Sequence, residues 1–428
     1  MTTPRPAPWY RELHWQILVG MALGVGAGAV GGPAFAERVE WLGILFVRLL
    51  KMVIVPLVVT SIVSGVAAVG GGRSLGRLFG KTLGYYVLSS ALAILVGLAA
   101  VNAIRPGVGA EIAGAGGGPV PEIQTPSSLS ELLLGMVPVN VVDAAAKPDM
   151  LAVILFCILF GAAVAGLPER PRETLQAFFE SAFQAMMALT SGIIRLAPIG
   201  VFALIARVVG TSGFESFRAL GLYMLTIALG LSVHLFLVLP LLLLLLGRID
   251  PRIHFRNMVE PLAMAFSTAS SAATLPVTLR AVEERVGVSN RVSSFVLPMG
   301  ATINMDGTAL YECAGVLFIA QVLGVDLSAS QQLVVVLTAL LASIGAAAVP
   351  SAGLVIIFLV LESVNLRGPE VDAIVGAMLA IDRPLDMFRT SVNVFSDSCG
   401  AAIIARSEGE KGVDRELRSV APSSGVQA

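Results

Sequence analysis

Six polar side chains share one face of an otherwise apolar stretch near the C-terminus. The stretch covers residues 380–406 and reads AIDRPLDMFRTSVNVFSDSCGAAIIAR. In a helix that turns about 100° per residue, the six polar positions fall within an arc of about 100°. They are Asp382, Asp386, Arg389, Thr390, Asn393 and Asp397. Such a face either lines a binding cavity or holds a structural ion-pair network, and in a membrane the cost of buried charge favours the cavity.

Arg389 indicates what this cavity would bind. A guanidinium away from water requires an anion, and its planar fork fits a carboxylate through two hydrogen bonds. Asp386, nearly one turn away, could simply pair with it. Asp382, Asp386 and Asp397 outnumber Arg389, however, even with Arg383 available, and this favours a zwitterionic acidic substrate. Its side-chain carboxylate would meet Arg389, and its ammonium group would meet Asp386. Its α-carboxylate would meet N–H and hydroxyl groups at Ser270 and Ser271.

Two amide–carboxylate pairs could bind Na⁺. Asn304 and Asp306 lie next to Gly307, which frees the backbone, and Asn393 and Asp397 are four residues apart on one helix face. Hard oxygen ligands from carbonyls, amides and carboxylates suit Na⁺. The alternative is that both pairs are satisfied hydrogen-bond networks within the membrane.

Glu312 is the only charged residue in its apolar segment after Asp306, and it lies two helical turns past Asn304. Removal from water disfavours the charged form of a carboxyl group, so Glu312 could carry a proton near neutral pH. The alternative is a structural glutamate that one hydrogen bond holds neutral.

Composition places these residues in a membrane protein. Of the 428 residues 56% are hydrophobic and 13% charged, with a mean hydropathy of +0.86, whereas soluble domains carry about 25% charged residues. The net charge of −1 and the lack of a basic tract argue against nucleic-acid binding. Three scattered cysteines indicate no disulfide framework. Three histidines without metal-ligand spacing argue against a metalloenzyme.

The apolar segments predict membrane spans of two kinds. Continuous spans are expected at residues 14–32, 41–69, 82–104, 174–209 and 217–246. Segment 132–165 is interrupted at Pro138, Asp143 and Pro148, and segment 292–322 is broken at residues 304–307. Segments 258–279 and 333–364 are interrupted at their midpoints by small residues and proline, and this is typical of re-entrant hairpins whose tips meet near the midplane. Each hairpin precedes a polar helix, so the two repeats suggest an inverted pair around one site, as in secondary transporters.

Basic residues predict the orientation in the membrane. They gather at the N-terminus and in residues 73–81, 170–172, 248–256 and 280–291, whereas loops 105–130 and 210–216 are poor in cations. The positive-inside rule therefore places both termini in the cytoplasm. Residues 33–36 mimic a signal-peptide cleavage site, but the span before them suits the first helix of a multi-pass protein.

The motifs resemble the dicarboxylate/amino acid:cation symporter family, which includes the excitatory amino acid transporters and the archaeal aspartate transporters. The likeness covers nearly the whole chain. It is carried by SSAATLP (270–276), NMDGTALYE (304–312), SIGAAAVPSAG (343–353), DMFRTSVNVFSD (386–397), FVRLLKMVIVP (46–56) and APIGVFALIA (197–206). The resemblance implies an all-α polytopic membrane protein of the glutamate-transporter-homologue fold. The resemblance further implies eight transmembrane helices plus two re-entrant helical hairpins, arranged as inverted repeats.

The resemblance also implies an assembly and a mechanism. Three independently working protomers would form a homotrimer in the lipid, and a C-terminal core would move like an elevator past scaffold helices. The expected division is 1–81 for scaffold helices 1 and 2, 82–130 for transport-domain helix 3 and an external loop, 131–215 for scaffold helices 4 and 5, 216–406 for the rest of the transport domain (helix 6, hairpin 1, helix 7, hairpin 2 and helix 8), and 407–428 for a cytoplasmic tail.

Site residues follow from the same resemblance. A first Na⁺ site matches Gly300, Asn304, Asn393 and Asp397. A second, formed largely by backbone carbonyls, matches Thr302, Met305, Ser343, Ile344 and Ala346. A third matches Tyr86, Ser89, Ser90, Asn304 and Asp306. Substrate contacts match Ser270, Ser271, Thr308, Val349, Asp386, Arg389, Thr390 and Asn393.

Individual positions refine the expected ions and substrate. Arg389 matches the arginine that marks members with acidic substrates, and Glu312 matches the glutamate of the proton-coupled, potassium-countertransporting animal members. Proton coupling is therefore expected, and K⁺ countertransport stays open. Archaeal members carry a further arginine in the first hairpin and animal members one on the last helix. The matching positions here, Ala269 and Met387, are uncharged, so the charge balance of the site must differ.

The sequence thus predicts a secondary active transporter and not an enzyme. It would couple L-aspartate or L-glutamate to Na⁺ and H⁺ in a prokaryotic inner membrane. A carrier of C4-dicarboxylates is disfavoured because its substrate has no ammonium for Asp386, and a carrier of neutral amino acids is disfavoured by Arg389. A substrate-gated anion channel stays open, with Arg48 and Pro56 where a path could run. An intramembrane hydrolase is remote, because no histidine lies beside Ser270.

Overall fold

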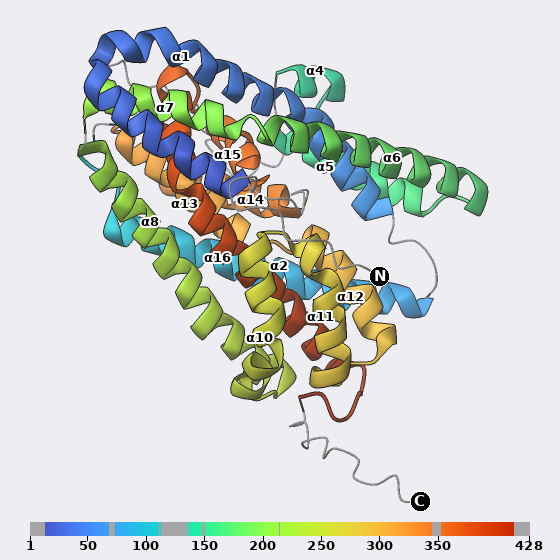
Figure 1. Ribbon diagram of the computed structural model, residues 1–428. Coiled ribbons are helices and arrows are strands. Elements are labelled where there is room, and N and C mark those ends of the chain that lie inside the picture. The colour runs from blue at the N-terminus through green and yellow to red at the C-terminus, as the bar shows by residue number, and fades with distance from the viewer. Residues whose placement is uncertain are drawn as a thin grey trace, which may run out of the picture.

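The computed structural model describes residues 13–67, 73–110, 112, 134, 137–147, 150–213, 215–344 and 352–414. These residues form helices almost throughout, with no β-strand among the elements of the described ranges (Figure 1). The all-α prediction is confirmed. A helix satisfies every interior backbone hydrogen bond within its own segment, which is why apolar spans take this form.

The first helix folds back on itself as two arms, as Figure 1 shows. α1 (Leu13–Ala67) contains 55 residues, and Gly32 interrupts it with a left-handed φ of 57° just before Pro33. At 1.5 Å per residue the whole stretch would reach about 80 Å, far beyond a hydrocarbon core of about 30 Å. The bend therefore divides α1 into two spans, in agreement with the predicted spans 14–32 and 41–69.

The middle of the chain departs from the prediction at one point. Residues 174–209 are predicted as one span, but the structure has α6 (Glu169–Ile194) and α7 (Ala197–Ser212) with a break at Arg195 and Leu196. Pro198 lies in the first turn of α7. Proline has no N–H to donate and its ring clashes with the carbonyl one turn earlier, so it ends one helix and begins the next.

The remaining N-terminal elements lie over the predicted spans, but the helix over residues 82–104 begins nine residues before the predicted span, at Arg73. They are α2 (Arg73–Ile104), α4 (Val141–Ala146), α5 (Met150–Ala165) and α8 (Glu215–Val233). α8 continues through two π-helical turns, η2 (His234–Val238) and η3 (Leu243–Gly247), on either side of α9 (Leu239–Leu242). Pro240 lies in this stretch and cannot donate an α-helical hydrogen bond, which accounts for the altered turns.

The C-terminal half contains two apolar segments that are broken at predicted places, and a further pair of helices. α10 (Pro251–Thr268) and α11 (Ser271–Ala281) meet at a tip, and η4 (Val282–Val286) extends α11. α12 (Asn290–Ile303) and α13 (Asp306–Val322) are separated by two unwound residues. α14 (Ala329–Ile344) and α15 (Ala352–Ser363) form the second pair, whose tip lies outside the described residues. The first pair is longer than the predicted segment 258–279.

The last helix, α16 (Pro369–Ser407), runs through the centre of this half. It packs against α10, α12 and α13, and also against α7 and α8 from the first half. Beside it, α13 is buried at every position from Asp306 to Ala320. Leu204 of α7 fits between the two halves, because a Cβ added at Gly43 of α1 or at Gly376 of α16 would lie within 2.8 Å of its side chain. The core thus surrounds the two helices that carry most of the predicted site.

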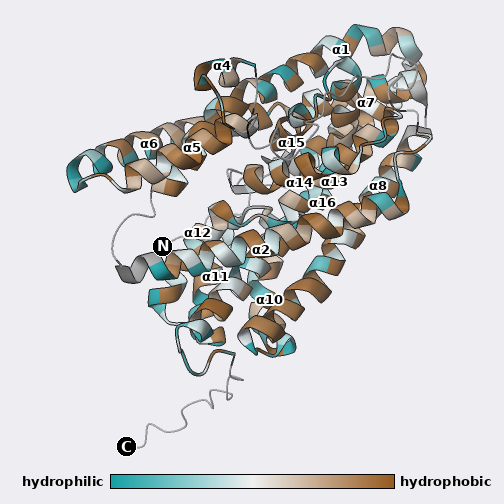
Figure 2. Cartoon of the chain, turned by 180° about the vertical axis from the view of Figure 1, so that it is seen from behind, coloured by the Kyte–Doolittle hydropathy of each residue, from teal (hydrophilic) through white to brown (hydrophobic). Residues whose placement is uncertain are grey.

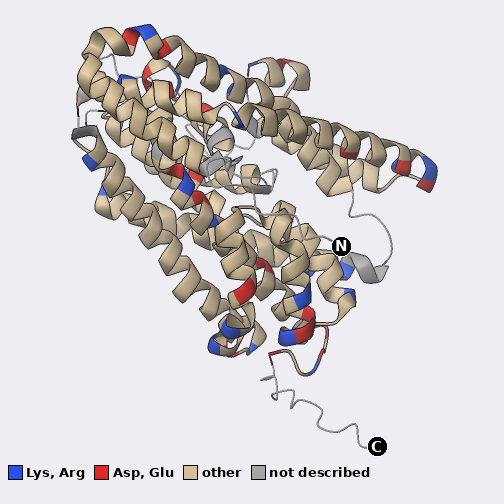
Figure 3. Cartoon of the chain, viewed as in Figure 1, with Lys and Arg blue, Asp and Glu red and all other residues tan. Residues whose placement is uncertain are grey.

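The outer surface is apolar between charged ends. Figure 2 shows hydrophobic residues along the outer sides of α5, α6 and α8, and Figure 3 shows Lys, Arg, Asp and Glu mainly near helix ends. Exposed side chains on α8 and its extension include Leu225, Leu229, Phe236 and Leu245. Four stretches of the described chain are long and apolar enough to cross a membrane: Trp15–Ala67, Arg77–Ile104, Glu169–Ile194 and Phe217–Gly247. Such a surface suits contact with lipid.

Candidate functional site

A buried charge cluster lies on the central helix. Arg389 is 1% exposed, and its Nη2 atom donates hydrogen bonds to Asp382 Oδ1 at 2.9 Å and to Asp386 Oδ1 at 3.0 Å. The two aspartates lie two turns and one turn earlier on α16, which is why all three side chains point the same way. The sequence left open whether Asp386 pairs with Arg389, and in this structure it does.

Arg389 keeps unused hydrogen-bonding capacity. Its guanidinium carbon lies 3.9 Å from the centre of the Tyr311 ring on α13, a cation–π contact. Its Nε and Nη1 atoms have no hydrogen-bond partner among the described residues. A Cβ added at Gly353 of α15 would lie 3.0 Å from Nη1 and 3.4 Å from Thr308 Cγ2. The unused donors therefore lie where α13, α15 and α16 meet, and a bound carboxylate could accept from them.

The unwound start of α13 is joined to α16 at the same place. Asn393 Oδ1 accepts a hydrogen bond from the Gly307 backbone at 2.8 Å, and Asn393 Nδ2 donates to Thr308 Oγ1 at 3.4 Å. A Cβ at Gly307 would lie 2.8 Å from the carbonyl oxygen of Arg389, so only glycine permits this approach. Thr390 donates to the Asp386 carbonyl oxygen at 2.8 Å. Thr308, Asp386, Arg389, Thr390 and Asn393 are thus brought together as predicted.

The first hairpin tip presents a helix N-terminus. Ala269 adopts a left-handed conformation with φ of 50°, and Ser270 caps α11 by accepting from the Ala273 backbone at 3.2 Å. Ser271 begins the helix and is buried. Free N–H groups at a helix N-terminus attract anions, and α11 packs against α16. Val349, the remaining predicted substrate contact, lies outside the described residues.

The first predicted Na⁺ set is largely assembled. Asn304 Nδ2 donates to Asp397 Oδ1 at 2.9 Å. Gly300 lies so close to Asp397 that an added Cβ would clash with the carboxylate oxygen. Asn393, the fourth member, uses its side-chain oxygen to bind the Gly307 backbone instead. One carboxylate, one amide and nearby backbone oxygens thus gather where α12 ends.

The third predicted set centres on Asp306, which is fully buried. Its Oδ1 atom accepts from Ser90 at 2.7 Å and from Ser89 at 3.2 Å, and Ser89 also reaches Asn304 Oδ1 at 3.3 Å. The Tyr86 hydroxyl donates to the Val296 carbonyl oxygen at 2.7 Å and so lies at the edge of the set. Four of the five predicted residues are therefore in mutual contact.

Two further residues contact Asp306 that the sequence did not single out. Ser396 donates to Asp306 Oδ2 at 2.6 Å and accepts from Asn304 Nδ2 at 3.0 Å. His234 Nε2 lies 3.0 Å from the same Oδ2 atom, and both side chains are fully buried. Ser396 lies on the edge of the polar face of α16, a signal that could have identified it. His234 is isolated in an apolar segment, and only its presence inside a span was informative.

The second predicted Na⁺ set is not assembled among the described residues. Thr302 is exposed and donates to the Met299 carbonyl oxygen at 3.0 Å, whereas Ser343 is buried and donates to Leu340 at 2.8 Å. Met305 is buried in the unwound turn. The Ile344 side chain and all of Ala346 lie outside the described residues.

The oxygen donors fit Na⁺ better than a transition metal. Within the described residues, no group of three His, Cys, Asp or Glu side chains could hold a metal ion. Each carboxylate of the two assembled sets is instead surrounded by amide, hydroxyl and backbone groups, the hard donors that alkali cations prefer. These residues could hold Na⁺ once the amide and hydroxyl groups turn their oxygens inward.

Glu312 is fully buried on α13, one turn after Thr308. Neither of its carboxyl oxygens has a hydrogen-bond partner in the described part of the chain. An ionised carboxylate without a partner is costly to bury, so the neutral form suits this environment. The predicted role as proton carrier is consistent with this placement.

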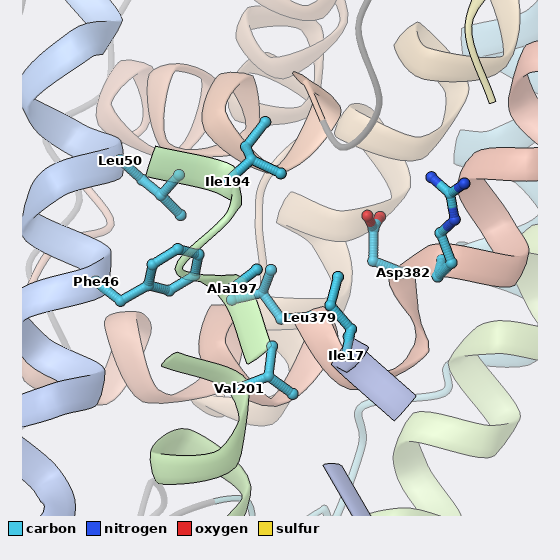
Figure 4. A pocket seen from close by; sticks show the side chains of 9 residues that line it. Ile17, Phe46, Leu50, Ile194, Ala197, Val201, Leu379 and Asp382 are labelled. Atoms are coloured by element: carbon cyan, nitrogen blue, oxygen red, sulfur yellow. The ribbon is translucent and has the colours of Figure 1, made fainter. Parts of the chain in front are cut away.

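An apolar pocket lies beside the charge cluster. Figure 4 shows Phe46, Leu50, Ile194, Ala197 and Val201 around it, with the Asp382 carboxylate at its edge. Its other lining residues are Ile17, Leu379 and Arg383. The pocket therefore separates the charged face of α16 from α1, α6 and α7.

Comparison with known proteins agrees with this geometry. The sequence matches the model of the sodium:dicarboxylate symporter family over residues 13–407. It is 35% identical to the proton/sodium-glutamate symport protein of Geobacillus stearothermophilus over 418 residues, 96% of this chain and 97% of the relative. It is 35% identical to excitatory amino acid transporter 3 of Mus musculus over 479 residues, 98% and 90% of the two chains. It is 34% identical to the proton/glutamate-aspartate symporter of Escherichia coli (strain K12) over 413 residues, 93% of each chain.

Proposed function

Because the chain belongs to the sodium:dicarboxylate symporter family, we propose that it is a secondary transporter for L-glutamate and L-aspartate, driven by Na⁺ and H⁺. The observation that carries the proposal is Arg389, which is fully buried, is paired with Asp386, and has two nitrogen atoms without a hydrogen-bond partner among the described residues. A desolvated guanidinium with spare donors is suited to a carboxylate. Its neighbouring aspartate is suited to an ammonium group.

Substrate binding would separate Arg389 from Asp386, which form an ion pair in this structure. The side-chain carboxylate of glutamate or aspartate binds Arg389, and the ammonium group binds Asp386. The α-carboxylate then lies at the N-terminus of α11, near Ser270 and Ser271, where free N–H groups favour an anion. Thr308, Thr390 and Asn393 surround the amino acid, and Val349 approaches it from the second hairpin. Binding thus replaces protein–protein pairs by protein–substrate pairs without leaving a buried charge alone.

Two Na⁺ ions would bind at the assembled sets, one at Gly300, Asn304, Asn393 and Asp397, the other at Tyr86, Ser89, Ser90, Asn304 and Asp306. A third would bind between the second hairpin and the unwound turn, at Thr302, Met305, Ser343, Ile344 and Ala346. The hydrogen bond from Gly307 to Asn393 joins the unwound turn to the substrate site. Filling a cation site therefore helps to order the substrate site. Glu312 carries the proton.

The membrane arrangement is part of the proposal. Eight helices would span the membrane and two hairpins would enter it, with both termini in the cytoplasm of a prokaryotic cell. Residues 1–81 and 131–215 form the scaffold of a homotrimer, residues 82–130 and 216–406 form the part that moves like an elevator, and residues 407–428 form a tail. The glycine-lined contacts around Leu204, between α1, α7 and α16, support a smooth boundary between the two parts.

Uptake into vesicles tests the function. We expect the purified chain in phospholipid vesicles to accumulate radiolabelled aspartate when an inward Na⁺ gradient is imposed. Unlabelled glutamate should compete, whereas succinate and serine should compete weakly. Stronger competition by succinate would indicate a dicarboxylate carrier, and stronger competition by serine a neutral amino-acid carrier. Substrate-gated current without accumulation would indicate a channel. Each of these three results would overturn the proposal.

A further inference from the structure

A second arginine, Arg383, lies beside Asp386, the residue proposed to bind the substrate ammonium group. Arg383 lies on α16 three residues before Asp386, and its Nη1 atom is 3.7 Å from Asp386 Oδ2. Its side chain is 17% exposed, and its buried Nε atom has no hydrogen-bond partner among the described residues. Arg383 lines the apolar pocket against α1, α6 and α7, and Asp382 is the only other charged residue among the described residues of the lining. Its guanidinium is therefore held near Asp386 by charge.

The two arginines share Asp386 between them. Arg389 bonds to its Oδ1 atom and Arg383 approaches its Oδ2 atom. Together with Asp382, the cluster contains two carboxylates and two guanidinium groups, so its formal charge is zero. Without Arg383 the same buried group would carry a charge of −1. An uncompensated buried charge is strongly unfavourable. Ala269 and Met387 supply no substitute, because both are uncharged.

We propose that Arg383 is a tethered cation, a positive side chain that neutralises Asp386 whenever no substrate ammonium is bound. This proposal rests on the proposed function. The positive charge of Arg383 makes the empty binding site electrically neutral. The empty carrier can then return across the membrane without K⁺ as a countertransported ion. When substrate arrives, its ammonium replaces Arg383 at Oδ2, and Arg383 withdraws toward the pocket. Arg383 acts through Asp386 and is a positioning residue.

Two transport modes separate this role from a merely structural one. Net uptake requires the empty carrier to return, whereas exchange of labelled aspartate for internal unlabelled aspartate does not. For the wild-type chain, we expect the rate of net uptake into vesicles loaded with K⁺ to differ by less than about twofold from the rate into vesicles loaded with choline. In R383Q, net uptake should fall about tenfold or more relative to exchange, since the empty site gains a net charge of −1. Internal K⁺ should restore part of that loss, and R383K should behave as wild type.

A matched control and the opposing results complete the test. Arg207 pairs with Glu40 at 2.7 Å and is comparably buried at 23% exposure, so R207Q should leave the ratio of net uptake to exchange unchanged. Equal loss of both modes in R383Q, or wild-type net uptake that rises several-fold with internal K⁺, would overturn the proposal. If R383Q is not recovered folded, the wild-type comparison of K⁺ with choline decides alone. Absence of wild-type exchange would instead refute the proposed function.

Discussion

Removal of the Arg389 side chain tests the centre of the site. In Arg389→Ala, the bound carboxylate loses the hydrogen bonds that it would accept from the guanidinium. Each hydrogen bond to a charged group contributes about 1.5–3 kcal/mol, so two contribute about 3–6 kcal/mol. At 1.4 kcal/mol per factor of ten, aspartate affinity should fall at least about a hundredfold. The side chain is fully buried, so no solvent-exposed group can take its place.

The assay is binding of aspartate to purified protein at saturating Na⁺, by calorimetry or by the shift of the melting temperature. Arg389→Ala also leaves Asp382 and Asp386 without their hydrogen bonds from Nη2, at 2.9 and 3.0 Å. Breaking a buried ion pair can cost about 3–5 kcal/mol of stability. The double variant with Asp382→Asn removes one of the two carboxylates and serves as the folding control.

The outcomes divide cleanly. A folded variant that still binds Na⁺ but not aspartate supports the carboxylate role, and Arg389→Lys should then recover part of the affinity, because lysine keeps the charge without the planar fork. A folded Arg389→Ala protein with wild-type aspartate affinity would refute the reasoning, and would make the cluster a structural ion pair.

Three further predictions follow from single contacts. In Asp397→Ala, the Na⁺ concentration that gives half-maximal aspartate binding should rise about tenfold or more, because the variant lacks the carboxylate of the first cation set. An unchanged Na⁺ titration would exclude Asp397 from that set. Glu312→Gln should keep Na⁺-dependent binding but abolish the pH dependence of transport, and surviving pH dependence would make Glu312 structural. Gly307→Ala should lower stability by about 1–3 kcal/mol, since the added Cβ meets the Arg389 backbone at 2.8 Å. Gly221→Ala, where nothing lies within 4 Å, is the control, and equal melting temperatures would contradict this packing argument.

Local sequence patterns predicted the parts of the site that lie on one element. The polar face of α16 follows from helical periodicity alone, because its members are three, four or seven residues apart. The breaks at Ala269 and at Asn304 were predicted because small and polar residues interrupt apolar segments there. Both features depend on neighbours in sequence, and the sequence therefore contains the information needed to predict them.

Some long-range pairings, such as Ser90 with Asp306, were predicted only through the family resemblance, and others were not predicted, for a physical reason. His234 and Asp306 are 72 residues apart, and nothing in either segment specifies which helix the other faces. Arg389 also contacts the Tyr311 ring and lies beside Gly353, both on other helices, and these contacts cannot be read from the sequence of its own helix. The break at Arg195 was missed because one proline in an apolar span can either kink a helix or end it.

The unwound turn between α12 and α13 explains why cations and substrate should depend on one another. Asn304 ends α12 and bonds to Asp397, Asp306 begins α13 and binds two serines of α2, and Gly307 bonds to Asn393 on the substrate face. These contacts lie within four consecutive residues. A change in the shape of the turn at a cation set must therefore also move the Gly307 N–H group, which donates its hydrogen bond to Asn393. Binding at either place therefore alters the free energy of binding at the other, and linkage requires the effect to be reciprocal. A single short segment can thus couple an ion gradient to an amino acid.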